Sequence, residues 1–235
     1  MSEKERDKII DQVMSLLELT KISGQVVGHE GSGLSKEELK RVAIAVELVT
    51  MPKILFVDEP TSGLDSFGAE LVMNAISRIA QSGCAVICVI HQPSRRIFEL
   101  CTDMLLLNRW GKQMFFGKIG NRSKRVIKYF KNLGFNFGKD ENPADVVLNI
   151  ASDIYAAEND KDCVAEFKQS KERKDMITTI GEIKNEFQPL PTNVPWFKSG
   201  FWRQLKACTK RWWLAQARAG HELWLDFARS VSLGI

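Results

Sequence analysis

The sequence predicts an α/β domain in which parallel strands are joined by helical crossovers. Two short apolar runs, Ile54–Val57 and Ala85–Ile90, are separated by a stretch that can form a helix from Asp65 to about Gln81. Unbroken apolar runs of this length are typical of parallel strands that are buried on both faces. A helix between two such strands makes a right-handed βαβ unit, so both strands would end at the same edge of the sheet.

Polar residues follow both runs directly. Asp58 and Glu59 come after the first run, and His91 comes after the second. Open α/β sheets bind their ligands at the carboxyl ends of the strands. One carboxylate can hold Mg²⁺ through water and the other can orient or deprotonate an attacking water, which is the Walker B pattern. A solvated acidic turn is the alternative interpretation of the carboxylate pair taken alone.

The flanking elements follow from caps and periodicity. A first helix is expected over about Glu3–Thr20, with a capping box at Ser2-x-x-Glu5, followed by a glycine-rich loop over Gly28–Gly33. A second capping box, Ser35-x-x-Glu38, opens a helix over Lys36–Val49. After the first strand, Pro60 and a short turn lead to a helix capped by Asp65 or Ser66, with Gly83 just past its end.

The second half of the chain predicts a hairpin and several helices. The hairpin consists of strands over Asp103–Asn108 and Gln113–Phe116. An amphipathic helix is expected over Asn121–Leu133, and Asn142-Pro143 reads as the start of a short helix to about Ile150. Residues 155–187 are charged and weakly patterned, with a helix expected near 161–172, and three prolines mark residues 188–195 as a linker.

The last part of the chain is basic and rich in tryptophan. Residues 188–220 contain no acidic residue, and all but one of the six tryptophans lie between Trp196 and Trp224. One amphipathic helix in the headgroup zone of a membrane accounts for both features. Packing of the tryptophans on the globular domain and nucleic-acid binding are the alternatives. The stretch Glu222–Ile235 is charged and shorter than the roughly 20 apolar residues that cross a bilayer.

Overall composition excludes few classes of protein. The chain has 235 residues, of which 44% are hydrophobic, and a net charge of +4 that comes mostly from the tryptophan-rich segment. That charge is therefore no evidence for a nucleic-acid partner. Five cysteines without metal-ligand spacing fit a reducing, cytosolic environment.

Several motifs together resemble those of ATP-binding cassette (ABC) ATPases. Leu34–Arg41 resembles the signature motif, Ile54–Glu59 the Walker B strand, Ser62–Asp65 the D-loop and His91 the switch histidine. The strings D-E-P-T-S-G-L-D and I-H-Q-P-S-R-R-I-F-E resemble the G subfamily of ABC transporters, in particular its pleiotropic drug resistance type. The resemblance implies a partial P-loop-type ABC ATPase domain, with a parallel sheet core and a helical signature subdomain, followed by an amphipathic elbow helix.

The resemblance also implies roles for single residues. Glu59 would be the general base or water-positioning carboxylate, and His91 would contact the γ-phosphate of ATP. Asp58 would hold Mg²⁺, through water. Asp65 would communicate across a dimer of two such domains, and Ser35 would touch the γ-phosphate of ATP held by the partner domain.

The chain departs from the family pattern in two places. Lys36 and Glu37 stand where the signature usually has two glycines, and Glu37 brings a negative charge near a polyphosphate. By resemblance, this signature would face a non-hydrolysing site, whereas the chain's own nucleotide face would be catalytic. No G-x-x-x-x-G-K-[ST] loop occurs, so we expect the chain to begin inside the domain and not to hydrolyse ATP at a useful rate alone. Whether it is an enzyme by itself stays open.

The sequence thus predicts a division into a nucleotide-binding part (1–155), a connector (156–195) and an elbow with the start of a membrane span (196–235). The expected function is the ATP-binding and ATP-hydrolysing portion of a transporter that exports hydrophobic compounds or lipids. It would sit at a membrane, with the nucleotide-binding part on the cytosolic face.

The expected partners are a second nucleotide-binding domain, a membrane-spanning domain and lipid headgroups, with no nucleic acid. A non-catalytic adaptor at the membrane surface that pairs with an intact nucleotide-binding domain is the alternative. A DNA-associated ATPase shares these motifs, but the long heptad coiled coils of that class are not visible in this sequence.

Overall fold

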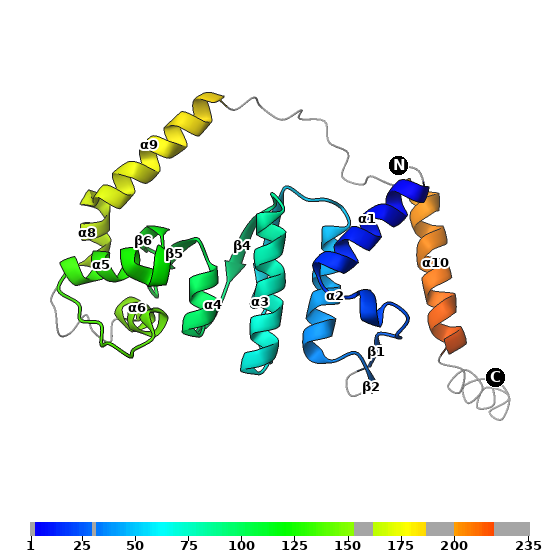
Figure 1. The fold of residues 1–235 in the computed structure, drawn as a ribbon. Coiled ribbons are helices and arrows are strands. Elements are labelled where there is room, and N and C mark those ends of the chain that lie inside the picture. The colour runs from blue at the N-terminus through cyan, green and yellow to red at the C-terminus, as the bar shows by residue number, and fades with distance from the viewer. Residues whose placement is uncertain (1–2, 30–31, 153–161, 187–199, 219–235) are drawn as a thin grey trace, which may run out of the picture. The chain divides into compact units, whose positions relative to one another are not determined.

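A computed structural model describes residues 3–29, 32–152, 162–186 and 200–218 of the chain. Two compact units, Met1–Asn185 and Glu186–Ile235, are considered separately. Figure 1 shows the order of the elements within each unit. The predicted division at residues 155 and 195 stays a prediction.

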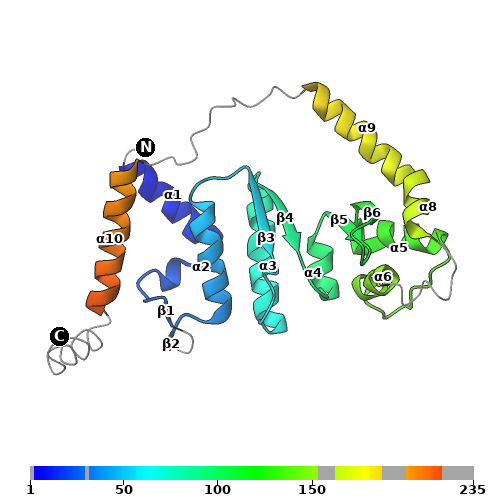
Figure 2. The ribbon, with the colours of Figure 1, turned by 180° about the vertical axis from the view of Figure 1, so that it is seen from behind.

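The predicted βαβ unit is present in the first unit. Strands β3 (Ile54–Asp58) and β4 (Ala85–Val89) pair in parallel, and helix α3 (Ser66–Gln81) is the crossover between them. Phe56 lies opposite Ile87, and Asp58 lies opposite Val89. The helix and both strands run side by side in Figures 1 and 2. The two strands therefore end together, as the sequence predicted.

The expectation that these strands are buried on both faces is wrong for the part of the chain that the structure describes. Leu55 is buried in the cluster that includes α3, whereas Phe56 next to it is 73% exposed. Ile87 and Val89 of β4 are also more than half exposed. Side chains alternate between the faces of a strand, so α3 covers only one of them. An apolar run in the sequence does not show whether other elements cover one face of the strand or both.

A helical layer precedes this unit. It contains α1 (Glu3–Leu16), the 3₁₀ turn η1 (Thr20–Ile22) and the signature helix α2 (Lys36–Leu48). Its apolar side chains share one core with α3 and include Val13, Leu17, Ile44, Val72 and Ile76. The capping box proposed at Ser2 lies outside the described residues. The glycine-rich segment, predicted as a loop, forms a small antiparallel hairpin of β1 (Gly28–His29) and β2 (Ser32–Gly33).

Two arginines explain why α1 ends before Thr20. The buried Arg41 of α2 donates from Nη1 to the Leu17 carbonyl at 3.0 Å. Arg78 of α3 donates from Nε to the Leu16 carbonyl at 3.1 Å and pairs with Glu18 at 3.1 Å. These contacts satisfy carbonyls that a helix end leaves without partners, so the chain can turn at Glu18. Through these hydrogen bonds, the signature helix and α3 both contact the segment in which α1 ends.

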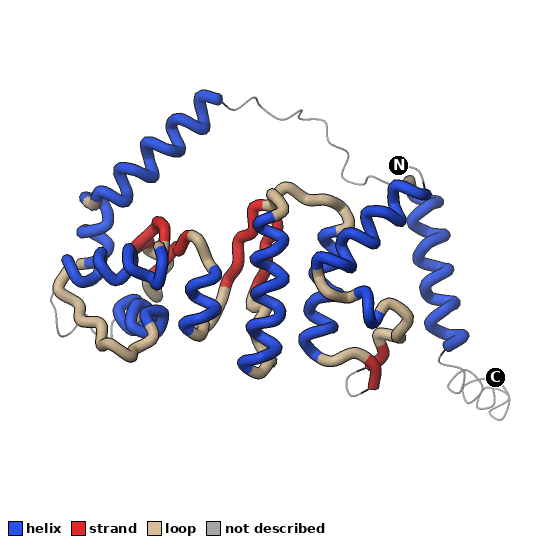
Figure 3. Tube along the Cα trace, viewed as in Figure 1, coloured by secondary structure: helices blue, strands red, loops and turns tan. Residues whose placement is uncertain are grey.

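The rest of the first unit surrounds a second core. Antiparallel strands β5 (Asp103–Leu107) and β6 (Gln113–Lys118) form the predicted hairpin. Four helices and the short turn η2 (Asn121–Ser123) accompany it: α4 (Arg95–Leu100), α5 (Lys124–Asn132), α6 (Pro143–Ala151) and α8 (Cys163–Gln169). Phe115, Phe130 and Phe167 are fully buried and lie close together at its centre. Figure 3 shows these strands and helices by type.

Two expectations for this half need correction. The helix predicted from Asn121 begins at Lys124, because Arg122 and Ser123 have positive φ angles of 51° and 57° that are incompatible with an α-helix. Beyond the helix expected near 161–172, the weakly patterned segment forms a second helix, α9 (Lys171–Glu186). Its isoleucines Ile177, Ile180 and Ile183 are each more than half exposed.

The second unit contains helix α10 (Phe201–Arg218), which lies in the tryptophan-rich segment. Trp202, Trp212 and Trp213 are exposed, as are Arg203, Lys206 and Lys210. Within the described parts of the chain, no helix combines the length and apolar character needed to cross a membrane.

Candidate functional site

The predicted carboxylate and imidazole meet at the end of the parallel strands. Glu59 directly follows β3, and His91 follows β4 by two residues. Glu59 Oε1 and His91 Nε2 are 3.0 Å apart, and the two side chains are 45% and 78% exposed, respectively. This geometry brings together a carboxylate and an imidazole that remain open to a ligand.

The backbone of Glu59 is held from several sides. Its N–H donates to the Val89 carbonyl at 3.0 Å, and its own carbonyl accepts from the Ser62 N–H at 3.2 Å. Lys40 Nζ of the signature helix also donates to that carbonyl, at 3.4 Å. Glu59 has a φ of 44°, a strained conformation for a residue with a side chain, which persists where neighbours hold it. Lys40 was not singled out in the sequence, since no motif marks a contact to a main-chain carbonyl.

Asp58 lies at the last position of β3 and is exposed. Among the residues that the structure describes, no group of three or more His, Cys, Asp or Glu is arranged to hold a metal ion. Mg²⁺ usually keeps several waters and takes one or two carboxylates together with substrate phosphates. The exposed carboxylate of Asp58 fits this way of binding Mg²⁺, in which water and phosphate supply the other ligands.

Ser35 is the N-cap of α2, and the predicted capping box is confirmed. Its hydroxyl is shared between Glu37 Oε1 at 2.6 Å and Glu38 Oε2 at 2.8 Å, while its N–H donates to Glu38 Oε2 at 2.8 Å. The hydrogen bonds from the Ser35 main chain and then from its hydroxyl lower the pKa of Glu38. A phosphate that approaches Ser35 would meet two carboxylates that already occupy the serine.

Asp65 also has a local partner. It is the N-cap of α3, and its Oδ1 accepts from the Gly68 N–H at 2.7 Å. A Cβ added at Gly68 would lie 2.9 Å from Asp65 Oδ1 and 3.4 Å from Glu37 Cβ. The cap of α3 therefore packs closely against the start of the signature helix, and glycine makes that approach possible.

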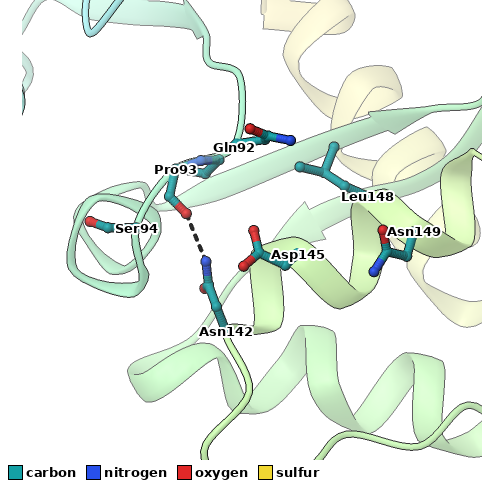
Figure 4. A pocket seen from close by; sticks show the side chains of 7 residues that line it. All are labelled: Gln92, Pro93, Ser94, Asn142, Asp145, Leu148 and Asn149. Carbon is teal, nitrogen blue, oxygen red and sulfur yellow. Dashed lines mark hydrogen bonds between the residues drawn. The ribbon is translucent and has the colours of Figure 1, made fainter. Parts of the chain in front are cut away.

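A polar pocket of about 460 Å³ lies beside the segment that follows His91. Figure 4 shows its lining side chains, which come from that segment, from the N-cap residue before α6 and from α6 itself: Gln92, Pro93, Ser94, Asn142, Asp145, Leu148 and Asn149. Asn142 caps α6 as predicted, with Oδ1 accepting from the Ala144 N–H at 3.2 Å. It makes a second bond that the sequence did not reveal, from Nδ2 to the Pro93 carbonyl at 2.8 Å.

The fold and the site define a portion of an ATP-binding cassette domain, and the ABC transporter family matches residues 1–62. The ABC-2 type transporter family matches residues 91–172. The chain is 38% identical over its whole length to ABC transporter G family member 2 of Dictyostelium discoideum. It is 43% identical over 65% of its length to Pleiotropic drug resistance protein TUR2 of Spirodela polyrhiza. The chain belongs to the G family of ABC transporters.

The chain spans 18% of the length of the Dictyostelium relative and 11% of the Spirodela relative. Among solved structures, a dimeric ATP-binding cassette in a post-hydrolysis state, bound to ADP and Pi, matches 52% of this chain and 50% of its own. The sequence identity is 27% and the TM-score is 0.40.

Proposed function

We propose that this chain is the ATP-binding and ATP-hydrolysing portion of a transporter that exports hydrophobic compounds or lipids across a membrane. The observation that carries the proposal is the 3.0 Å contact between Glu59 and His91 at the carboxyl ends of two parallel strands. Membership of the G family supports the transport part of the proposal.

Each residue at this edge has a distinct task. Glu59 orients or deprotonates the attacking water, and His91 holds Glu59 in place and contacts the γ-phosphate. Asp58 holds Mg²⁺ through water, and the ion neutralises charge on the phosphates. Because the sequence has no G-x-x-x-x-G-K-[ST] loop, the chain alone provides no lysine for the β- and γ-phosphates and does not hydrolyse ATP at a useful rate.

The other two predicted residues act between domains. Ser35 faces ATP held by a second nucleotide-binding domain, and Asp65 links the two sites through the start of α3. Glu37 and Glu38 disfavour phosphate at Ser35, which suits a weak site that does not hydrolyse ATP.

We propose further that α10 lies in the headgroup zone of the cytosolic face. Its exposed tryptophans and basic residues suit that zone, and the 188–220 stretch has no acidic residue that an anionic surface would repel. Sedimentation with vesicles of mixed neutral and anionic lipid measures this binding. We expect Trp212→Ala together with Trp213→Ala to weaken it, whereas Trp110→Ala, in the first unit, leaves it unchanged.

Hydrolysis is tested in two assays. The purified chain is expected to show no Mg²⁺-dependent ATPase activity, so robust activity that Glu59→Gln abolishes would contradict the proposed inactivity. In the transporter that carries this segment, Glu59→Gln is expected to stop hydrolysis while ATP stays bound. Glu47→Gln, at an exposed position of the signature helix, is the matched control.

The adaptor remains a second candidate because the chain contains no phosphate-binding loop. Co-purification with an intact nucleotide-binding domain whose ATPase rate does not depend on Glu59 would favour it.

A further inference from the structure

The segment after His91 is fastened to the loop that opens α6. Asn142 Nδ2 donates to the Pro93 carbonyl at 2.8 Å (Figure 4), and Arg95 Nη2 donates to the Glu141 carbonyl at 2.5 Å. These two bonds cross between segments that are distant in sequence, and α4 also packs against α6. We call this pair of hydrogen bonds the switch latch.

The latch acts on a strained stretch of backbone. Gln92, between His91 and Pro93, has a φ of 42°, which residues with a side chain seldom adopt. Such a conformation persists only where the surrounding structure holds it in place. Proline has no N–H, so its carbonyl is the one main-chain group by which a neighbour can hold Pro93. Asn142 bonds to that carbonyl.

We propose that Asn142 is a positioning residue that keeps the imidazole of His91 within reach of Glu59. The contacts form a continuous chain: Asn142 bonds to Pro93, two residues after His91, and His91 contacts Glu59 at 3.0 Å. A catalytic consequence rests on the proposed function, in which Glu59 and His91 act on ATP. The positional effect is a property of this chain and can be measured without nucleotide.

The two bonds of Asn142 can be separated by one substitution. Asn142→Asp keeps an oxygen that caps the Ala144 N–H, and aspartate is as good an N-cap as asparagine. It replaces the donor to Pro93 by a second acceptor, so the Asn142–Pro93 bond of the switch latch is lost while the cap of α6 remains. Asp162→Asn is the matched control, because Asp162 caps α8 through Oδ1 and the exchange preserves that acceptor.

The experiment is a histidine-selective NMR spectrum of the full 235-residue chain, with His91 assigned from the variant His91→Gln. Glu59→Gln provides the reference position for an imidazole whose partner carboxylate is removed. We expect the His91 signal of Asn142→Asp to move toward that reference, with the separated form favoured roughly two- to tenfold more than before, as loss of one hydrogen bond implies. Asp162→Asn should leave the signal in place.

An unchanged His91 signal in Asn142→Asp, with a clear shift in Glu59→Gln, overturns the proposal that Asn142 positions His91. The proposed function is then unaffected. If Glu59→Gln does not move the His91 signal, the Glu59–His91 contact is absent in solution, and both proposals fail. Thermal unfolding of Asn142→Asp, compared with Asn142→Ala, checks that α6 keeps its cap. The alanine variant loses both bonds and should melt at the lower temperature.

Discussion

The strand edge at Glu59 and the signature start at Ser35 use polar side chains in opposite ways. At the strand edge the backbone of Glu59 is held by Val89, Ser62 and Lys40, while its carboxylate and the imidazole of His91 stay partly open to solvent. At the signature the hydroxyl of Ser35 is taken up by Glu37 and Glu38 of its own helix. Glu59 is held in the fold by hydrogen bonds of its main chain, which leaves its carboxylate partly open to a ligand. The Ser35 hydroxyl is bound within its own helix start.

The largest effect is expected at the strand edge. In the transporter that carries this segment, Glu59→Gln should lower ATP hydrolysis by roughly 10²- to 10⁴-fold, the usual contribution of a general base. Ser35→Ala should change hydrolysis by no more than roughly twofold, since the serine is already occupied by carboxylates. Equal losses in both variants, measured as steady-state phosphate release, would remove the contrast between the two regions.

The second prediction concerns Cys88, a partly buried thiol in strand β4. Burial, and then the neighbouring Cys101, raise the pKa of the Cys88 thiol in β4 from 9.0 to about 12. At pH 8 its alkylation by iodoacetamide should be much slower than that of Cys208, which is exposed in α10, because the thiolate is the reactive form and Cys88 is partly buried. Mass spectrometry of the tryptic peptides measures both rates. Equal rates would mean that β4 opens readily to solvent.

The same pKa shift predicts a loss of stability in alkali. The folded state keeps the Cys88 proton that the unfolded state releases, so this contribution is present below pH 9 and is lost as the pH rises from 9 to about 12. Cys88→Ala should reduce the slope of unfolding free energy against pH within that window. Chemical denaturation at several pH values provides the comparison.

The fourth prediction concerns a double variant that frees the hydroxyl of Ser35 from one of its two carboxylate partners. Lys36→Gly combined with Glu37→Gly removes a carboxylate from Ser35 and should strengthen ATP-dependent association with a second nucleotide-binding domain. The cost is helix stability, about 1 kcal/mol for each glycine. Glu47→Gly, at an exposed position of α2, adds one glycine, with about half that cost in helix stability, and leaves the surroundings of Ser35 unchanged. If both variants associate equally, Glu37 does not keep phosphate away.

The smallest effect is expected at Glu38. Hydrogen bonds from Ser35 lower its pKa, so the stabilisation is present above pH 4.5 and is lost as the pH falls below that value. Glu38→Gln should flatten this acid limb of the stability curve. Ser35→Ala, which keeps the main-chain N–H, should flatten it only in part. An acid limb that persists unchanged in Glu38→Gln would show that other groups cause it.

Much of the local structure was predictable because its causes lie within a few residues. The capping box at Ser35, the caps at Asp65 and Asn142, and the parallel pairing of two apolar runs follow from short-range patterns, and the structure confirms them. The end of α1 was not predictable, since it depends on Arg41 and Arg78, which come from later helices. Helix α9 has too little periodicity to be recognised by pattern alone.

The sequence by itself determined the membership of the G family, the residues of each motif and the order in which they occur, because these depend on residue type and spacing. Only the tertiary structure decided that Glu59 and His91 touch and that one face of β3 and β4 is exposed. It also decided that Lys40 bonds to the Glu59 carbonyl and Asn142 to the Pro93 carbonyl. Those contacts join residues far apart in the chain. Their geometry depends on how whole elements pack, and no local pattern contains that information.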